Sequence, residues 1–157
     1  MKSIIDSNEV IAIAFGEADH LSCEAVSEAD IMVASDRYLR PILGQKLIDA
    51  LIEGKYSDLV DDYVAPALAY AVRMVVQPAI NLRLGDSGLF APKTDSSQRP
   101  DREAVEGLQR SIRVRARQLL RRLSDYVECN ASKFKEYESS ENIFNRCTID
   151  GGFVQVF

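Results

Sequence analysis

The chain has 157 residues, 46% of them hydrophobic and 27% charged, and its formal net charge is -5. This length suits one domain with a core of ordinary size, and the composition is that of a globular protein. The negative charge argues against bulk nucleic-acid binding. Three widely spaced cysteines without a CxxC pair argue against a disulfide scaffold or a zinc site. The start, MKSIIDSNEV, lacks the apolar run of a signal peptide, so we expect a cytoplasmic origin.

Two short helices are predicted at the beginning of the chain. Ser7 can cap the first, which ends at Gly16. Ser27, three residues before Asp30, has the spacing of a capping box and predicts the start of the second. Ser22 is a competing start one turn earlier.

Pro41 predicts the end of the second helix, or a kink in it, because the residue before a proline disfavours helical geometry. The next segment, PILGQKLIDALIEG, is predicted to be a short amphipathic helix that stops at Gly54. Its apolar stripe consists of Leu43, Leu47, Ile48, Leu51 and Ile52.

Residues 58–84 are predicted to form a central helix that is apolar around most of its circumference and therefore needs neighbours on several sides. A membrane span is the alternative, but Arg73 and two amides lie inside the pattern. We expect one of the two prolines, Pro66 and Pro78, in a first turn and the other at a kink or break.

Residues 85–99 are rich in turn-forming side chains, so we expect a loop that is mobile in the isolated subunit, with Leu89 and Phe90 as an anchor for a partner. Asp101 can cap a long helix that reaches about residue 128. Its apolar positions, spaced by three or four, are Val105, Leu108, Ile112, Ala116, Leu119, Leu123 and Tyr126. The side chains predicted to be buried in the two long helices are Leu68, Ala71, Met74, Val75, Leu108, Ile112, Leu119 and Leu123.

Arginines mark the polar side of this long helix. Arg110, Arg117 and Arg121 fall opposite the apolar stripe, with Arg113 on its flank. Residues 101–126 hold seven arginines against four acids, whereas residues 1–66 hold thirteen acids against five bases. The arginine row fits a solvated face, a contact with an acidic neighbouring subunit, or a contact with DNA phosphates.

The C-terminal segment changes character. Asp150-Gly151-Gly152 is a hairpin-type turn, and FVQVF alternates as a strand does, which predicts a small β-hairpin or an extended arm. The predicted fold is therefore all-α, a bundle of about four to five helices over residues 1–140 followed by a C-terminal arm or hairpin over residues 141–157.

No catalytic signature accompanies this pattern. His20 is the only histidine, and the P-loop, GxGxxG, G-x-S-x-G and H-E-x-x-H motifs are absent. The acidic pair Asp61-Asp62 lacks the dense oxygen ligands of a calcium loop. We expect a protein that is not an enzyme, with no catalytic, cofactor-binding or metal-binding residues.

Several motifs occur together in a recognisable order. Ile-x-x-Ala-x-x-x-Tyr-Leu-x-Pro-Ile-Leu-Gly spans Ile31–Gly44, Tyr-x-x-Pro-x-Leu-Ala-Tyr spans Tyr63–Tyr70 and Leu-Gly-Asp-x-Gly-Leu spans Leu84–Leu89. An Arg-rich helix and Phe-Lys-Glu-Tyr at Phe134–Tyr137 follow. Over about residues 4–140 the chain resembles the small helical head-tail connector, or adaptor, proteins of tailed phages and prophages of Bacteroides-like bacteria.

The resemblance implies a non-enzymatic virion protein made in the bacterial cytoplasm. Such subunits form a homo-oligomeric ring, commonly of twelve copies, between portal and tail proteins, through which DNA passes without sequence-specific contact and without a membrane. The candidate subunit-interface residues are Arg110, Arg113, Arg117, Arg121, Asp58, Asp61, Asp62, Leu89, Phe90, Phe153, Val154 and Val156. A small helical regulatory or nucleic-acid-binding module is the alternative function.

Overall fold

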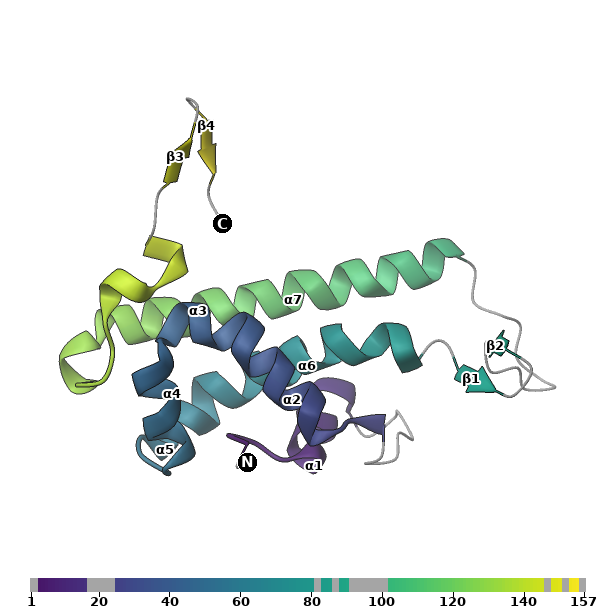
Figure 1. Ribbon diagram of the computed structural model, residues 1–157, viewed down its shortest axis with the longest axis horizontal. Helices are drawn as coiled ribbons and strands as arrows, with labels where there is room; N and C mark the ends of the chain where they lie inside the picture. Colours follow the sequence, from purple (N-terminus) through teal and green to yellow (C-terminus); the bar gives the residue numbers. More distant parts are fainter. Residues whose placement is uncertain are drawn as a thin grey trace.

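The computed structural model describes residues 3–16, 25–80, 83–85, 88–90, 102–145, 148–150 and 153–155. These residues are mostly helical, which confirms the predicted all-α class (Figure 1). The helices are α1 (Ser7–Val10), α2 (Glu28–Ala34), α3 (Arg40–Leu43), α4 (Gln45–Ile52), α5 (Ser57–Leu59), α6 (Ala65–Ile80) and α7 (Arg102–Cys129). Segments of π-helix form η1 (Ile11–Phe15), η3 (Ser35–Leu39) and η4 (Val60–Val64). Short 3-10 turns form η5 (Ala131–Lys133), η6 (Ser139–Glu141) and η7 (Ile143–Asn145).

Capping boxes open the first two helical runs. The side chain of Asp6 accepts a hydrogen bond from the Glu9 amide at 2.7 Å, and the Glu9 carboxylate accepts one from the Asp6 amide at 2.9 Å. The prediction of Ser7 as the cap was therefore wrong by one residue, because only Asp6 has an acid three positions later to complete the box. The predicted Ser27 cap is confirmed, with Asp30 as its partner.

Prolines inside the helices are accommodated by widened turns. Pro41 does not end its helix as predicted, since α3 continues through it as far as Gly44. The π-helical η3 directly precedes α3, just as η4 directly precedes α6 with Pro66 at its second position. A proline lacks an amide donor and its ring crowds the carbonyl four residues back, so a turn with i to i+5 bonding relieves both problems.

The central helix runs without a break through α5, η4 and α6, from Ser57 to Ile80. The predicted end at residue 84 was wrong, because Arg83–Gly85 forms strand β1, which pairs antiparallel with β2 (Gly88–Phe90). Pro78 in the last turns of α6 removes a helical donor close to this end. Most of the predicted loop over residues 85–99 lies outside the described residues.

This central helix passes the length and composition test for a membrane span, with a mean hydropathy of 1.2 in its most apolar window, half of which is buried inside the protein. It packs between α7 on one side and α1, η1 and α2 on the others (Figure 1). Its buried residues in α6 are Ala65, Ala67, Leu68, Ala69, Ala71, Val72, Val76 and Gln77. The packing is that of the central core helix that the sequence predicted. Met74 and Val75, predicted to be buried, are only partly covered.

The stripe by which α7 packs on α6 is shifted from the predicted one. The buried residues of α7 are Ile112, Ala116, Leu120, Leu123, Ser124 and Val127. Leu108 is 41% exposed and Leu119 is only partly buried, so these two burial predictions were wrong. The buried stripe of α7 is centred about 50° around the helix from Ile112, between Ala116 and Val127, and at about 100° per residue Leu120 lies closer to that centre than Leu119 does.

Beyond α7, the turns η5, η6 and η7 follow in succession, and the last two contact α3. Strands β3 (Thr148–Asp150) and β4 (Phe153–Gln155) then pair antiparallel, with Ile149 opposite Val154.

Candidate functional site: an arginine groove

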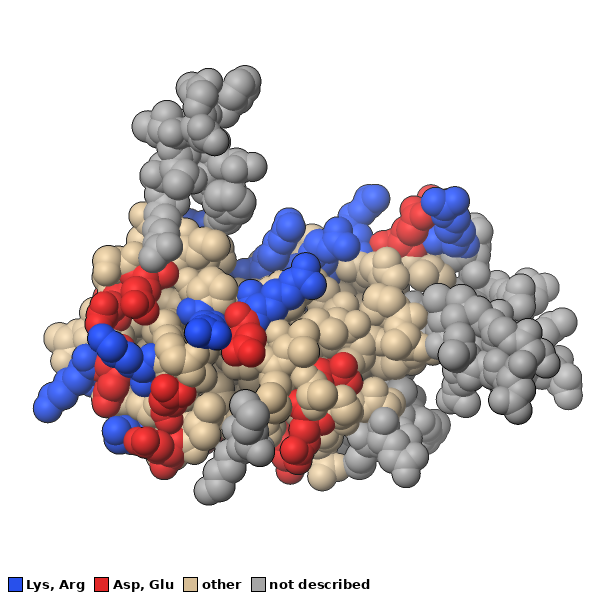
Figure 2. Space-filling view, viewed as in Figure 1, with Lys and Arg blue, Asp and Glu red and all other residues tan. Residues whose placement is uncertain are grey.

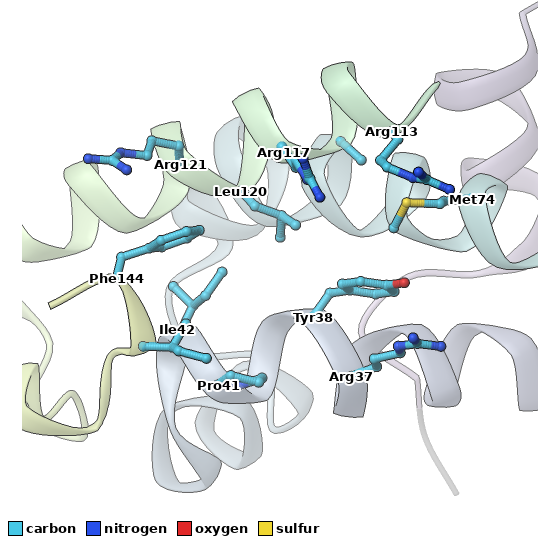
Figure 3. Close-up of a pocket in the computed structure, with 12 residues that line it drawn as sticks. Arg37, Tyr38, Pro41, Ile42, Met74, Arg113, Arg117, Leu120, Arg121 and Phe144 are labelled. Carbon is cyan, nitrogen blue, oxygen red and sulfur yellow. The ribbon is translucent and has the colours of Figure 1, made fainter. Parts of the chain in front are cut away.

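A groove of about 930 Å³ runs between α7 and the η3–α3 segment (Figure 3). We call it the arginine groove after Arg37, Arg113, Arg117 and Arg121, which line it. The rest of its lining consists of Tyr38, Pro41, Ile42, Met74, Ala116, Leu120, Ile143 and Phe144. It is therefore a basic rim over an apolar floor.

Helical spacing explains why the arginines gather. Arg113, Arg117 and Arg121 follow one another at four-residue steps, which places them on one side of α7 over about 12 Å of helix. Figure 3 shows Arg117 directed into the groove from α7, and Arg37 on the opposite wall. The groove lining contains no acidic side chain, and no described acid forms a salt bridge with these four arginines. No described carboxylate therefore neutralises these four guanidinium groups within the subunit.

Aromatic rings hold two of these guanidinium groups. The Cζ atom of Arg121 lies 5.5 Å from the centre of the Phe144 ring, and that of Arg37 lies 5.5 Å from the centre of the Tyr38 ring. Both distances are within the range of cation–π attraction. Phe144 comes from η7, so the C-terminal turns supply one wall of the groove.

A buried polar network fixes that wall. Asn142 is fully buried, and its amide nitrogen donates hydrogen bonds to Ser124 Oγ and to the Tyr137 hydroxyl, each at 2.8 Å. Its Oδ1 accepts a hydrogen bond from the amide of Phe144 at 3.0 Å. Because Ser124 belongs to α7, this network ties the η6–η7 segment to the long helix and sets the position of Phe144.

The network ends at a carboxylate. Tyr137 donates its hydroxyl proton to Glu128 at 2.5 Å, and the Ser139 hydroxyl donates to the other oxygen of the same carboxylate. Burial, followed by the hydrogen bond to Glu128, raises the pKa of Tyr137 to about 12. The hydrogen bonds from Ser139 and Tyr137 lower the pKa of Glu128. Both groups are therefore held in the forms present at neutral pH.

The α3–α4 corner braces the same segment from the other side. Lys46 forms a salt bridge with Glu138. Gly44 has φ of 75°, and a Cβ atom there would lie 2.5 Å from Glu141 Oε2. Only glycine fits both the left-handed backbone and this close approach.

The opposite flank of α7 carries a second set of arginines, each stacked on a tyrosine of the central helix. Arg122 lies 4.9 Å from the centre of the Tyr63 ring, and Arg115 lies 5.0 Å from that of Tyr70. Tyr63 also stacks on Tyr126, with ring centres 3.9 Å apart and planes inclined by 18°. Neither of these two arginines lines the groove.

The structure separates the arginines that the sequence had grouped. Arg113, Arg117 and Arg121 line the groove, whereas Arg110 borders a shallow depression on the outer side of α7 with Gly107 and Val114. Sequence reasoning missed Arg37 and Phe144. The Arg37-Tyr38 pair close to Pro41 was a local sign for Arg37. No local pattern in the sequence predicts that η7 returns to α7 and places Phe144 there.

The predicted acidic partners lie away from the groove. Asp58, Asp61 and Asp62 are exposed on α5 and η4, whose Tyr63 packs on the tyrosine side of α7. Among the other candidate residues, Leu89 and Phe90 belong to β2, and Phe153 and Val154 to β4. Val156 lies outside the described residues.

Figure 2 shows how charge is arranged over one face of the molecule. Basic side chains gather along its upper side over α7, whereas most acidic side chains lie below them. The lining of the groove combines guanidinium groups with apolar surface, and Tyr38 supplies its only hydroxyl group. Such an arrangement is complementary to an anionic, partly apolar surface.

Metal-binding groups do not converge in the described part of the chain, where no three His, Cys, Asp or Glu side chains lie close enough to hold an ion. Cys129 is a free, exposed thiol. His20, Cys23 and Cys147 lie outside the described residues.

Comparison with known families adds one finding. The sequence pattern of DUF6712, a family of unknown function, matches residues 32–146, which include the groove and the whole of the central and long helices. No curated protein and no solved structure matches the chain.

Proposed function

We propose that this chain, which belongs to the DUF6712 family of unknown function, is a non-enzymatic subunit of a phage head-tail connector. It is made in the bacterial cytoplasm from a prophage and is assembled as a ring between portal and tail. The motifs at Ile31–Gly44 and Tyr63–Tyr70, which resemble those of connector proteins, support this function.

The observation that carries the proposal is the placement of charge on different sides of one subunit. The arginine groove opens on one flank of α7, and Asp58, Asp61 and Asp62 are exposed on elements that pack against the other flank. A surface that meets a different surface of the next copy generates a ring when the rotation closes. Surface charge pairs of this kind contribute on the order of 0 to 1 kcal/mol each, so they set orientation and salt sensitivity more than affinity.

The proposed subunit is a bundle of about four to five helices over residues 1–140 with a C-terminal hairpin or arm over residues 141–157. Phe153, Val154 and Val156 of the arm supply apolar contact to a neighbour by adding a strand to its sheet edge. Leu89 and Phe90 anchor the segment near β2 against the portal or the tail.

Incorporation into phage particles tests this function. The variant Arg117→Glu with Arg121→Glu, and a variant lacking residues 148–157, should both be depleted from purified particles. Arg110→Glu is the matched control, because Arg110 lies outside the groove. Full incorporation of both variants at ordinary salt would contradict the proposed assembly.

The arginine row also favours a second candidate, a nucleic-acid-binding module. In that case the isolated chain should bind duplex DNA with an affinity that falls steeply with salt, by a slope of about 0.9 per phosphate contact. The connector proposal expects no such retention at physiological salt, because DNA passes through the ring without specific contact.

A further inference from the structure

The floor of the arginine groove requires more than an acidic partner. Carboxylates alone would neutralise the guanidinium groups but leave Tyr38, Met74 and Phe144, which are only partly buried, facing water. Burial of apolar surface is the main source of affinity at interfaces, and charge pairs at the rim set register. The occupant that fits is a segment with acidic and aliphatic side chains on one edge.

The acidic segment proposed above supplies carboxylates but no exposed apolar side chain. Asp58, Asp61 and Asp62 are exposed, yet α5 and η4 contain no large hydrophobic residue among the exposed ones. In the described residues, the exposed large hydrophobic side chains are Ile13, Val33, Leu108 and Val114. The last two belong to α7 itself, among its arginines.

The N-terminal edge of the subunit has both the acidic and the exposed apolar side chains that the groove requires. Asp6 and Glu9 are exposed at the start of α1, and Ile13 follows Glu9 by one turn with 37% of its surface exposed. We call the exposed side of α1 and η1, with Glu9, Ala12 and Ile13, the α1–η1 edge. The capping box of Asp6 and Glu9 holds the start of this edge in a fixed shape.

The position of this edge suits a head-to-tail contact. Both α1 and η1 pack on α6, and Figure 1 places them on the side of α6 that faces away from α7. The edge and the groove therefore lie on different sides of the subunit, as a heterologous interface requires.

We propose that the arginine groove of one copy receives the α1–η1 edge of a second copy. Ile13 rests on the apolar floor, and the Glu9 carboxylate faces the arginine row. This inference rests on the proposed head-to-tail association of copies, and it replaces Asp58, Asp61 and Asp62 by the α1–η1 edge as the surface that fills the groove.

Disulfide trapping between full-length chains tests the contact. One chain carries Ala12→Cys, the other carries Met74→Cys in the groove, and the three native cysteines are changed to serine in both. The control pair replaces Ala12→Cys by Asp61→Cys, which is also exposed. The mixed disulfide, followed on non-reducing gels and by mass spectrometry, should form at least ten times faster with Ala12→Cys than with Asp61→Cys.

Second-site changes provide further controls. Ile13→Asp or Arg117→Glu should lower the trapping rate to that of the control pair, whereas Val33→Asp, an equal change at another exposed aliphatic residue, should leave it unchanged. Equal rates for the two cysteine pairs, or faster trapping with Asp61→Cys, would overturn the inference. If the disulfide does not form but the chain is incorporated normally into particles, the docking is refuted and the connector function is not. If the disulfide forms but the chain is absent from particles, the connector function is refuted and the docking is not.

Discussion

Arg121 and Arg122 are neighbours in the sequence, yet their guanidinium groups stack on aromatic rings on two different sides of α7. Arg121 lies over Phe144 of η7, and Arg122 lies over Tyr63 of η4. Successive residues of a helix point about 100° apart, so one helix divides its arginines between two flanks. One flank binds the subunit's own tyrosines, and the other borders the groove. This division separates the arginines that stack on the central helix from those that line the groove.

Leu123 should be a main contributor to the free energy of unfolding. It is fully buried at the α6–α7 contact, so Leu123→Ala should destabilise the protein by about 2 to 5 kcal/mol, as expected for a core leucine. The control is Leu108→Ala, at a side chain 41% exposed, which should cost about 0.5 kcal/mol or less. Equal shifts in urea melts for the two variants would contradict the packing of α7.

Asn142 should anchor the wall that carries Phe144. Asn142→Ala removes the partner of Ser124 and Tyr137 in a buried place, and should cost about 1 to 3 kcal/mol. It should also speed hydrogen exchange of the Phe144 amide, which loses its acceptor. Gln118→Ala, at an exposed amide side chain of α7, is the control and should change stability by about 0.5 kcal/mol or less. Unchanged exchange at Phe144 in Asn142→Ala would show that the wall is held by other contacts.

Stability should fall at alkaline pH because of Tyr137. Its pKa is raised to about 12 in the folded protein, so its contribution is complete below the unfolded pKa near 10 and is lost as pH rises through the folded pKa. The loss amounts to about 2 to 3 kcal/mol at most, because a tenfold change in proton affinity corresponds to roughly 1.4 kcal/mol. Tyr137→Phe lacks this titration, so the stability difference between wild type and variant should shrink between about pH 10 and 12. A constant difference over that range would rule out the burial of this hydroxyl.

Stability should also fall at acidic pH because of Glu128. Its pKa is lowered by the hydrogen bonds from Ser139 and Tyr137, so its contribution is present above the unfolded pKa and is lost as pH falls through the folded one. Glu128→Gln should therefore flatten the acid limb of the stability profile, measured by urea melts below pH 5. An unchanged acid limb would contradict the role of this carboxylate.

Gly44 should tolerate alanine less well than Gly54 does. Both have positive φ, of 75° and 86°, and Gly44, with ψ of 160°, has a backbone conformation that is essentially restricted to glycine, so an alanine there costs about 1 to 3 kcal/mol. At Gly44 the new Cβ atom also meets Glu141, whereas at Gly54 nothing lies within 4 Å. Gly44→Ala should therefore destabilise more than Gly54→Ala, and Glu141→Ala in the same chain should restore part of the difference. Equal costs at both glycines would show that Glu141 moves aside freely.

The sequence predicted those features that depend on local patterns. The Ser27 cap, the stop at Gly16 and the apolar central helix follow from capping chemistry and periodicity, and the structure confirms them. The predicted central helix included Pro66, but the widened turns before Pro41 and Pro66 were not predicted, because they leave no clear mark in the sequence.

The sequence predicted only one wall of the arginine groove. Helical spacing brought Arg113, Arg117 and Arg121 together, but it placed Arg110 with them and could not supply the second wall. That wall depends on Arg37 and on Phe144, which reach α7 only through tertiary contacts such as the buried amide of Asn142. Long-range packing of this kind is set by the whole fold and not by any local run of residues.

The number of copies of this chain in purified phage particles tests the connector account most directly. Quantitative mass spectrometry with the portal protein as internal standard should give a small, fixed number of copies per particle, commonly twelve, and cryo-electron microscopy should place them between portal and tail. Absence of the chain from particles, or a copy number that follows the capsid shell, would contradict the account.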